Sequence, residues 1–371
     1  MGISVRVYGA GSIGNHLTHA CRTKGWDVTV IDTDPAALER MKGSIYPSRY
    51  GGWDTSIQLT TPNAVPNSRA DVVILGTPPD SHMALALGIL ERNAPKVMLV
   101  EKPLCTPDIS QSDCLAELAA RAGTLVLTGY NHTTVPVSVA AVEQIKADVV
   151  GRPLTLIAEF REHWGGIFSA HPWLSGPSDT YLGFWRRGGG ASGEHSHAMN
   201  IFQFFAHALG AGRVTEVTAL LDYVEENGSA YDRLCQLHVR TESGLAGSIV
   251  QDVITEPAQK RVRIQGDAGF IEWYVNFKKT QDRIIYGRRN GTPHHQEFDK
   301  TRPDDFRYEI DHIERLLSGV DRPEDSPIHL DRGLETMLLI AAAHRSAATR
   351  EPVRIDYSQG WTDKALSGAR L

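Results

Sequence analysis

The sequence predicts two domains of different class: an α/β domain built on a doubly wound parallel sheet, and an α+β domain with an open, mostly antiparallel sheet. Up to residue 132, short apolar runs alternate with amphipathic segments of helical period. Beyond residue 213, strand-like runs follow one another with short turns, as antiparallel strands do. At 371 residues the chain is too long for one ordinary core. We expect domains at 1–132 and 133–371, with a helix over 330–349 packing back on the first.

Residues 5–32 have the pattern strand, glycine loop, helix, strand. The loop is Gly9-Ala10-Gly11-Ser12-Ile13-Gly14, a G-x-G-x-x-G placed where a strand passes into a helix. In such a loop the first glycine allows the tight turn, the second lets the backbone approach a diphosphate, and the third lets the helix pack closely. The helix then presents free N–H groups and its positive dipole end to the diphosphate. This stretch predicts a Rossmann domain whose loop, including Ser12 and Ile13, binds a dinucleotide.

Asp32 ends the second strand, 18 residues after Gly14. This is near the spacing at which a carboxylate accepts hydrogen bonds from the adenosine ribose diol. The acid would repel a 2′-phosphate and no arginine follows at once, so we expect NAD rather than NADP. The alternative is that Asp32 only caps the next helix, but Asp34-Pro35 already supplies an N-cap and an N1 proline.

The connection after this unit is less regular. A short helix carries Leu38 and Met41, and the polar stretch 44–69 shows little pattern beyond an edge strand near Ile57. A buried strand over 71–76 then leads into Thr77-Pro78, and Asp80 can cap the helix that contains His82. Ligands bind at the carboxyl ends of such strands, so we expect Thr77, Pro78 and His82 to contact the cofactor. A simple capped turn explains the stretch about equally well.

Lys102 follows the fourth strand, 96–100, within Glu101-Lys102-Pro103. A lysine at the carboxyl end of a central parallel strand faces the ligand crevice, so Glu101 and Lys102 are expected near the nicotinamide. The alternative is a surface lysine at a strand end. Another amphipathic helix, with Leu115 on its inner side, precedes the fifth strand, 125–128, which ends in Gly129-Tyr130-Asn131.

In the second domain, five runs are predicted as strands: 214–223, 234–240, 246–253, 262–265 and 270–274. The C-terminal helix carries Leu334, Met337, Leu338 and Ala341 on one stripe, a pattern of core packing.

The four motifs of the first domain resemble those of the glucose-fructose oxidoreductase, inositol dehydrogenase and rhizopine-catabolism (Gfo/Idh/MocA) family in order and spacing. They are the glycine loop, Thr77-Pro78 with His82, Glu101-Lys102-Pro103, and Gly129-Tyr130-Asn131. The C-terminal pattern around Asp311 and the helix closing at Pro352 is also similar, so the resemblance covers nearly the whole chain. It implies that Asn131 contacts NAD, that the second sheet faces the nicotinamide, and that the chain forms a dimer or tetramer.

The stretch 188–200, Gly-Gly-Gly-Ala-Ser-Gly-Glu-His-Ser-His-Ala-Met-Asn, opens a polar helix. His197 matches the family histidine that acts on the substrate hydroxyl. The family acid one turn earlier is replaced by Gly193, with Glu194 next to it, and the later acid is replaced by Asn200. Some sugar-nucleotide members are similar in this respect. The i, i+3 spacing predicts that Glu194 accepts a hydrogen bond from His197 and raises its basicity, while Lys102 polarises the same substrate oxygen. The alternative is a packed histidine, because Ile201 continues its stripe.

Between residues 161 and 187 runs a long segment, rich in aromatic and basic residues, without a repeated pattern. Such a loop is usually functional or disordered, and aromatic faces with Arg and His suit a polyol ring that carries a carboxylate or phosphate. The alternative is that its tryptophans fill a subunit interface. The residues predicted to contact substrate are Arg161, His163, Trp164, Trp173, Trp185, Arg186, and beyond the segment His195 and Asn200.

Composition excludes several other classes. The net charge is −6 with both signs mixed along the chain, so no nucleic-acid surface is indicated. The four cysteines lack metal spacing and form no disulfide framework, and no metal site is predicted. With no signal peptide or membrane span in view, we expect a cytoplasmic protein.

Together the residues and the resemblance predict an NAD-dependent dehydrogenase that oxidises a CH–OH group of a sugar, cyclitol or nucleotide-linked sugar. Three alternatives stay open: an NAD-dependent glycosidase with transient redox chemistry, a catalytically silent sugar sensor, and a purely structural interaction protein. The last would not need Asp32, Lys102 and His197 together.

Overall fold

The computed structural model describes residues 2–169 and 173–367 and contains two sheets. The first has six parallel strands in the order β3-β2-β1-β4-β5-β6. Its strands are β1 (Ser4–Tyr8), β2 (Asp27–Ile31), β3 (Gln58–Thr60), β4 (Val72–Leu75), β5 (Val97–Val100) and β6 (Leu125–Thr128). The predicted fold class is confirmed, and this order is that of a doubly wound Rossmann sheet.

Helices cover both faces of this sheet. They are α1 (Ser12–Thr23), α2 (Pro35–Arg40), α3 (Tyr46–Tyr50), α4 (Pro79–Asn93) and α5 (Ser112–Ala122). Because side chains alternate along a strand, Val73 and Leu75 of β4 pack on the side of α4 and α5, while Val72 and Ile74 pack on the side of α1. The connection after β2 is more regular than predicted, because a π-helical turn, Met41–Ile45, joins α2 directly to α3.

The second sheet has ten strands in the order β14-β13-β12-β11-β7-β10-β9-β8-β15-β16, antiparallel except for β7 with β10. The strands are β7 (Pro153–Arg161), β8 (Val214–Glu226), β9 (Ser229–Thr241), β10 (Ala246–Asp252), β11 (Gln259–Gly266), β12 (Gly269–Lys278), β13 (Gln281–Arg288), β14 (His294–Asp299), β15 (Val353–Ile355) and β16 (Leu366–Ser367). The predicted runs lie in β8 to β12. On β9, Cys235, Leu237 and Val239 are buried, whereas Gln236 and His238 between them are exposed. One face of this sheet is therefore covered and the other is open.

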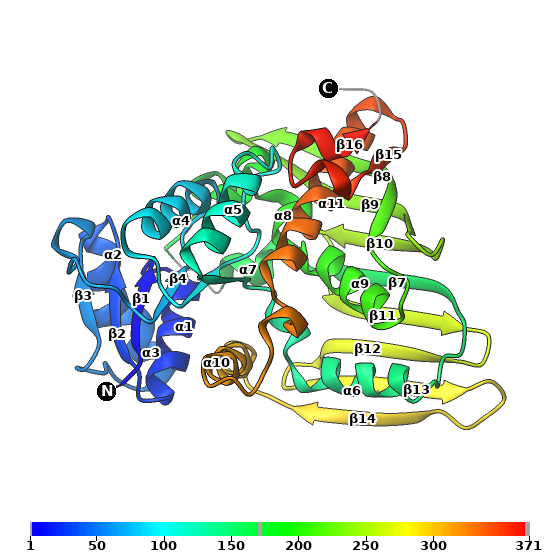
Figure 1. Ribbon diagram of the computed structural model, residues 1–371, viewed down its shortest axis with the longest axis horizontal. Coiled ribbons are helices and arrows are strands. Elements are labelled where there is room, and N and C mark those ends of the chain that lie inside the picture. Colours follow the sequence, from blue (N-terminus) through cyan, green and yellow to red (C-terminus); the bar gives the residue numbers. More distant parts are fainter. Residues whose placement is uncertain (1, 170–172, 368–371) are drawn as a thin grey trace.

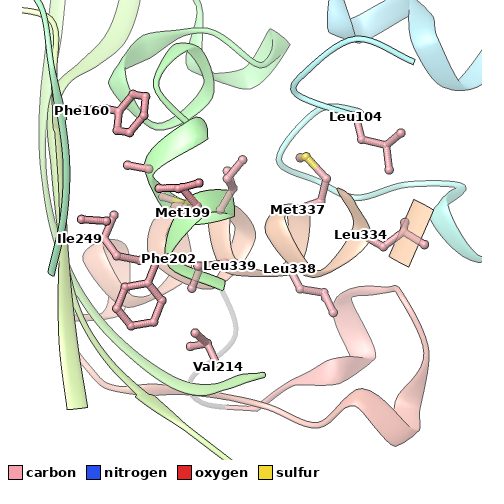
Figure 2. Packing of buried hydrophobic residues seen from close by; sticks show 14 of the residues in the cluster. Leu104, Phe160, Met199, Phe202, Val214, Ile249, Leu334, Met337, Leu338 and Leu339 are labelled. Carbon is pink, nitrogen blue, oxygen red and sulfur yellow. The ribbon is translucent and has the colours of Figure 1, made fainter. Parts of the chain in front are cut away.

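The remaining helices are α6 (Pro136–Lys146), α7 (Trp164–Ser169), α8 (Gly190–Glu194), α9 (His197–Ala208), α10 (Asp304–Leu317) and α11 (Leu330–Thr349). Of these, α6, α8, α9 and α11 pack on strands of the second sheet, whereas α10 packs on α1. Figure 1 shows the two sheets side by side with α11 between them. In Figure 2, Met199 and Phe202 of α9 lie between Ile249 of β10 and the leucines of α11. This packing fixes the start of α9, where His197 stands.

The C-terminal part returns to the first sheet. Phe306, Ile310 and Ile313 of α10 share a core with β1 and α1. Residue 328 accepts a hydrogen bond from the Thr128 N–H at 2.8 Å, and His329 forms a bridge with Leu127 of β6. We propose that the domain division still falls after residue 132, with 304–328 as a return segment. No helix in the described ranges is long and apolar enough to cross a membrane.

Candidate active site

The glycine loop has the geometry that its three glycines predict. Gly9 has a φ of +104°, and a Cβ there would lie 2.6 Å from the carbonyl oxygen of Gly76. A Cβ on Gly14 would overlap the carbonyl oxygen of Gly9, whereas a Cβ on Gly11 would meet no atom within 4 Å. The loop is therefore closed on its inner side and open at Gly11. The α1 N-terminus has no side-chain cap, so its first-turn N–H groups remain for an anion such as a diphosphate.

Asp32 is tied to this loop. Its carboxylate accepts hydrogen bonds from the N–H of Ala10 at 2.8 Å and of Asp34 at 2.9 Å. Asp34 itself caps α2 through the N–H of Ala36, so Asp32 is not the cap. From the other side Arg49, which the sequence did not single out, donates to the Ser12 carbonyl and hydroxyl oxygens at 3.0 and 2.9 Å. These residues fit a dinucleotide, whose diphosphate would meet the α1 N-terminus and Arg49 and whose ribose diol would meet Asp32.

His82, which we expected to contact the cofactor, has no exposed surface. It is fully buried, with Nε2 2.8 Å from the Thr77 carbonyl oxygen and Nδ1 3.2 Å from that of Pro103. Burial lowers its pKa, so the ring is neutral. A buried ring cannot touch the cofactor; it joins the turn after β4 to the turn after β5. Asp80 is not the helix cap either, since that position is Pro78, and Asp80 instead pairs with Arg187 at 2.6 Å.

Lys102 reaches across to the second domain. Its Nζ donates to both the carbonyl oxygen and the Oε2 of Glu194, each at 2.9 Å. Glu101 beside it is buried, and its Oε2 accepts a hydrogen bond from the Lys102 backbone N–H at 3.3 Å. Burial raises the pKa of Glu194, but Lys102 and His195 outweigh that effect and hold it below the ordinary value. Glu194 is therefore an ionised partner of Lys102.

The predicted hydrogen bond from His197 to Glu194 is wrong. The i, i+3 argument assumed one continuous helix, but α8 ends at Glu194 and α9 begins only at His197. His195 between them leaves the helical conformation, with φ −97° and ψ 21°. The break turns the two side chains apart, and the carboxylate goes to Lys102 instead.

His197 lies in an aromatic cage. Its ring centroid is 4.5 Å from that of His132, 5.6 Å from Tyr130 and 6.0 Å from Phe160. Its Nδ1 is buried and has no hydrogen-bond partner among the described residues. Burial lowers its pKa well below the ordinary value, and the charge of Lys102 lowers it further. His197 is therefore neutral, and it shares one electrostatic environment with Lys102.

Further titratable groups surround this pair. His195 is buried, with an Nε2 that has no partner in the described part of the chain, and burial lowers its pKa to about 4. Glu162 pairs with Lys260 at 2.7 Å, and its charge acts on both His195 and Glu194. Sequence reasoning missed His132, Glu162 and Lys260. Of these three, only His132 could have been predicted from the sequence, because it directly follows the Gly129-Tyr130-Asn131 motif. Asn131 has a buried Oδ1 without a hydrogen-bond partner in the described ranges.

The aromatic segment is more ordered than predicted. It contains α7 and three 3-10 turns at 177–179, 181–183 and 185–187. Trp164 is buried against Phe168 and Tyr231. Trp185 stacks on His344 with ring centroids 4.5 Å apart, and the Arg186 guanidinium lies 4.3 Å from the centroid of the Trp185 ring. These rings pack within the chain, which corrects the expectation that Trp164 contacts substrate.

Most of the other residues predicted to contact substrate also have partners within the chain. Arg161 pairs with buried Asp252 at 2.6 Å, and His163 accepts a hydrogen bond from the Gly165 N–H at 3.0 Å. Asn200 is buried and donates to Thr336 of α11 at 3.2 Å, so it belongs to the core and not to a ligand surface. Trp173 is 37% exposed and borders residues 170–172, which lie outside the described ranges.

A buried polar network supports α8 from below. Asp232 accepts hydrogen bonds from the Ser192 N–H at 2.7 Å and hydroxyl at 3.0 Å, and Ser192 Oγ lies 3.1 Å from Nε2 of His344. A Cβ on Gly190, whose φ is +72°, would overlap the Asp232 carboxylate. Close approach to Asp232 thus explains Gly190, whereas a Cβ on Gly189 would overlap the carbonyl oxygen of Tyr181 and one on Gly193 that of Gly188. In the described ranges no group of three His, Cys, Asp or Glu residues could hold a metal ion.

Comparison with known proteins identifies a family match over the first domain, where the glycine loop lies. Residues 3–130 match the family GFO_IDH_MocA, described as an oxidoreductase family with an NAD-binding Rossmann fold. No curated protein matches the sequence.

Solved structures similar to the whole chain include three sugar-related enzymes. Aldose-aldose oxidoreductase from Caulobacter crescentus, complexed with glycerol, has a TM-score of 0.73 at 15% identity and covers 96% of this chain and 100% of its own. Levoglucosan dehydrogenase, with NADH and levoglucosan, has 0.74 at 15%, covering 95% and 99%. The WlbA dehydrogenase from Bordetella pertussis, with NADH and UDP-GlcNAcA, has 0.70 at 19%, covering 96% and 99%. At these identities the likeness establishes a shared fold over both domains.

Proposed function

We propose that this chain is a dehydrogenase. The premise is that its N-terminal domain belongs to the Gfo/Idh/MocA oxidoreductase family and is an NAD-binding Rossmann fold. Its substrate would be a secondary alcohol of a sugar, cyclitol or nucleotide-linked sugar. The observation that carries the proposal is the ion pair of Lys102 with Glu194, three residues before a neutral, caged His197. Sugar and sugar-nucleotide ligands in the similar structures support the substrate class.

Bound at the glycine loop, NAD would accept the hydride that leaves the alcohol carbon. The chain's own residues would handle the proton and the oxygen. With its hydrogen on the buried Nδ1, His197 would use Nε2 as the base that takes the hydroxyl proton. Two of the three ammonium protons of Lys102 are used by Glu194, so the third is free to hydrogen-bond the substrate oxygen as negative charge develops there.

The test is oxidation of a panel of sugars, cyclitols and sugar nucleotides in the presence of NAD, followed by the absorbance of reduced nicotinamide. Lys102→Ala and His197→Ala should each lower turnover by roughly 100-fold or more while NADH binding, measured by fluorescence, survives. His238→Ala, on the open face of β9, is the matched control and should keep the wild-type rate. NAD binding without turnover of any compound would favour the sensor or glycosidase instead.

A further inference from the structure

A cavity of about 340 Å³ lies where the ends of β7, β11 and β12 meet the N-terminal end of α10. All of its walls come from the second domain. Four of the lining side chains are cationic: Lys260, Lys279, Lys300 and Arg302. The volume is within the range of small-molecule pockets.

Two of the four cations have carboxylate partners inside the protein. Lys260 pairs with Glu162 at 2.7 Å, and buried Lys300 pairs with both Asp282 and Asp305 at 2.9 Å. Lys279 and Arg302, the other two cations, have no such pairing within the described ranges.

Lys279 and Arg302 have no carboxylate within 4 Å among the described residues; Arg302 only lies over the ring of Phe306 at 5.9 Å. The four cations of the cavity thus face three carboxylates, which leaves a net charge of +1, and Lys279 and Arg302 are the two cations without an ion-pair partner among the described residues. Guanidinium and ammonium groups placed together in this way recognise carboxylate and phosphate oxygens.

The cavity adjoins the candidate active site. His132 and His197 both lie against the ring of Phe160 of β7, and His132 also lies near that of Trp273 of β12. Two residues beyond these rings, Glu162 and Val275 line the cavity. The charge of Lys260 also acts on His197. Glu162 belongs to both places, because it lines the cavity and acts on His195 and Glu194. A ligand whose hydroxyl carbon lies at His197 would therefore extend toward Arg302 and Lys279.

We propose that this cavity binds an anionic group of the substrate, a carboxylate or a phosphoryl group, through Arg302 and Lys279. The inference rests on the proposed function and narrows it: the substrate is a sugar acid or a phosphorylated or nucleotide-linked sugar, not a neutral polyol. A neutral ring would gain nothing from this net positive charge. An anion there would also offset the positive field on His197 and raise the basicity of that imidazole.

The experiment measures binding by calorimetry, with NADH present, for a panel of neutral hexoses, the matched uronates and the matched 6-phosphates. The uronate and phosphate arms distinguish the two kinds of anion. At least one anionic member should bind 10-fold or more tightly than its neutral counterpart, and the preference should weaken as salt is raised. Arg302→Gln and Lys279→Gln should each remove most of that preference. Lys278→Gln, next to Lys279 but 3.9 Å from Glu297, is the control and should keep it.

Equal binding of neutral and anionic members throughout the panel would overturn the inference. So would variants that weaken NADH binding instead, because the cavity would then serve the cofactor diphosphate. Turnover is scored separately. Anion binding that depends on Arg302 but leads to no oxidation would reject the dehydrogenase while leaving the anion site standing.

Discussion

Asp232 should give the protein a stability that depends on pH in a direction opposite to that of most carboxylates. It is fully buried beneath α8, and burial raises its pKa from 3.8 to about 7. At about 1.4 kcal/mol per pH unit, this difference corresponds to roughly 4 kcal/mol in favour of the neutral carboxyl. Because the folded-state pKa is the higher one, the stabilisation is complete below pH 4 and is lost as the pH rises through 7.

The variant Asp232→Asn removes this titration while keeping the shape. Its Oδ1 can still accept from the Ser192 N–H, and its amide can donate to the Ser192 hydroxyl oxygen, which leaves the serine proton for His344. We therefore expect the variant to lose only about 1 kcal/mol at pH 5. Between pH 5 and pH 9 the wild-type protein should lose about 3 kcal/mol that the variant does not lose, so the order of their stabilities should reverse.

The assay is guanidinium unfolding of both proteins at several pH values from 5 to 9, compared by the difference in midpoint. Asp222→Asn is the control, because Asp222 is ion-paired with Arg233 at the surface and should change stability by at most about 1 kcal/mol. Stability curves for wild type and Asp232→Asn that run parallel over this pH range would refute the reasoning.

Four further outcomes are expected at the cofactor and substrate sites. Asp32→Ala should lower the ratio of NAD to NADP affinity, measured by fluorescence titration; an unchanged ratio would contradict the cofactor assignment. Gly14→Ala should weaken NADH binding by about 10-fold or more with the circular dichroism spectrum retained, since its Cβ would overlap Gly9. Glu194→Gln should lower kcat by about 10-fold with NADH affinity kept, because Lys102 loses its charged partner. The pH profile of kcat/KM should show its acid limb below pH 6.5, since burial lowers the pKa of His197; a limb above pH 7 would exclude this base.

Local patterns in the sequence were sufficient for the first domain. The glycine loop, Asp32 and the strands that end at Thr77 and Lys102 are each marked by residues adjacent in sequence, so periodicity and turn chemistry located them. Strand β13 was missed because one of its buried positions is Asp282, so its alternation in burial does not appear as an alternation of apolar residues. Strand β14 was missed because it is polar and almost entirely exposed. The helix over 46–50 was missed because a π-helical turn and Pro47 interrupt its pattern.

The active site was predicted less completely, since its decisive contacts are not local. Nothing in the sequence indicates that Lys102 bonds to Glu194, 92 positions away, and helical spacing pointed to His197 instead. The helix before the break at His195, α8, is held on Asp232, 40 positions away, by a tertiary contact that helical spacing does not reveal. Likewise the sequence suggests a ligand contact for His82, whereas the structure buries its ring between the carbonyl oxygens of Thr77 and Pro103.

The return of 304–328 to the first sheet has a consequence for how the molecule is made. The ribosome synthesises the nucleotide-binding half first, yet Phe306, Ile310 and Ile313 of α10 share a core with α1, and residues 328 and 329 bond to the edge of β6. During synthesis that half therefore stays incomplete until residue 329 of the 371 has been added. Excising residues 1–132 would expose the same surface, so we expect that fragment to be less stable alone than within the full chain.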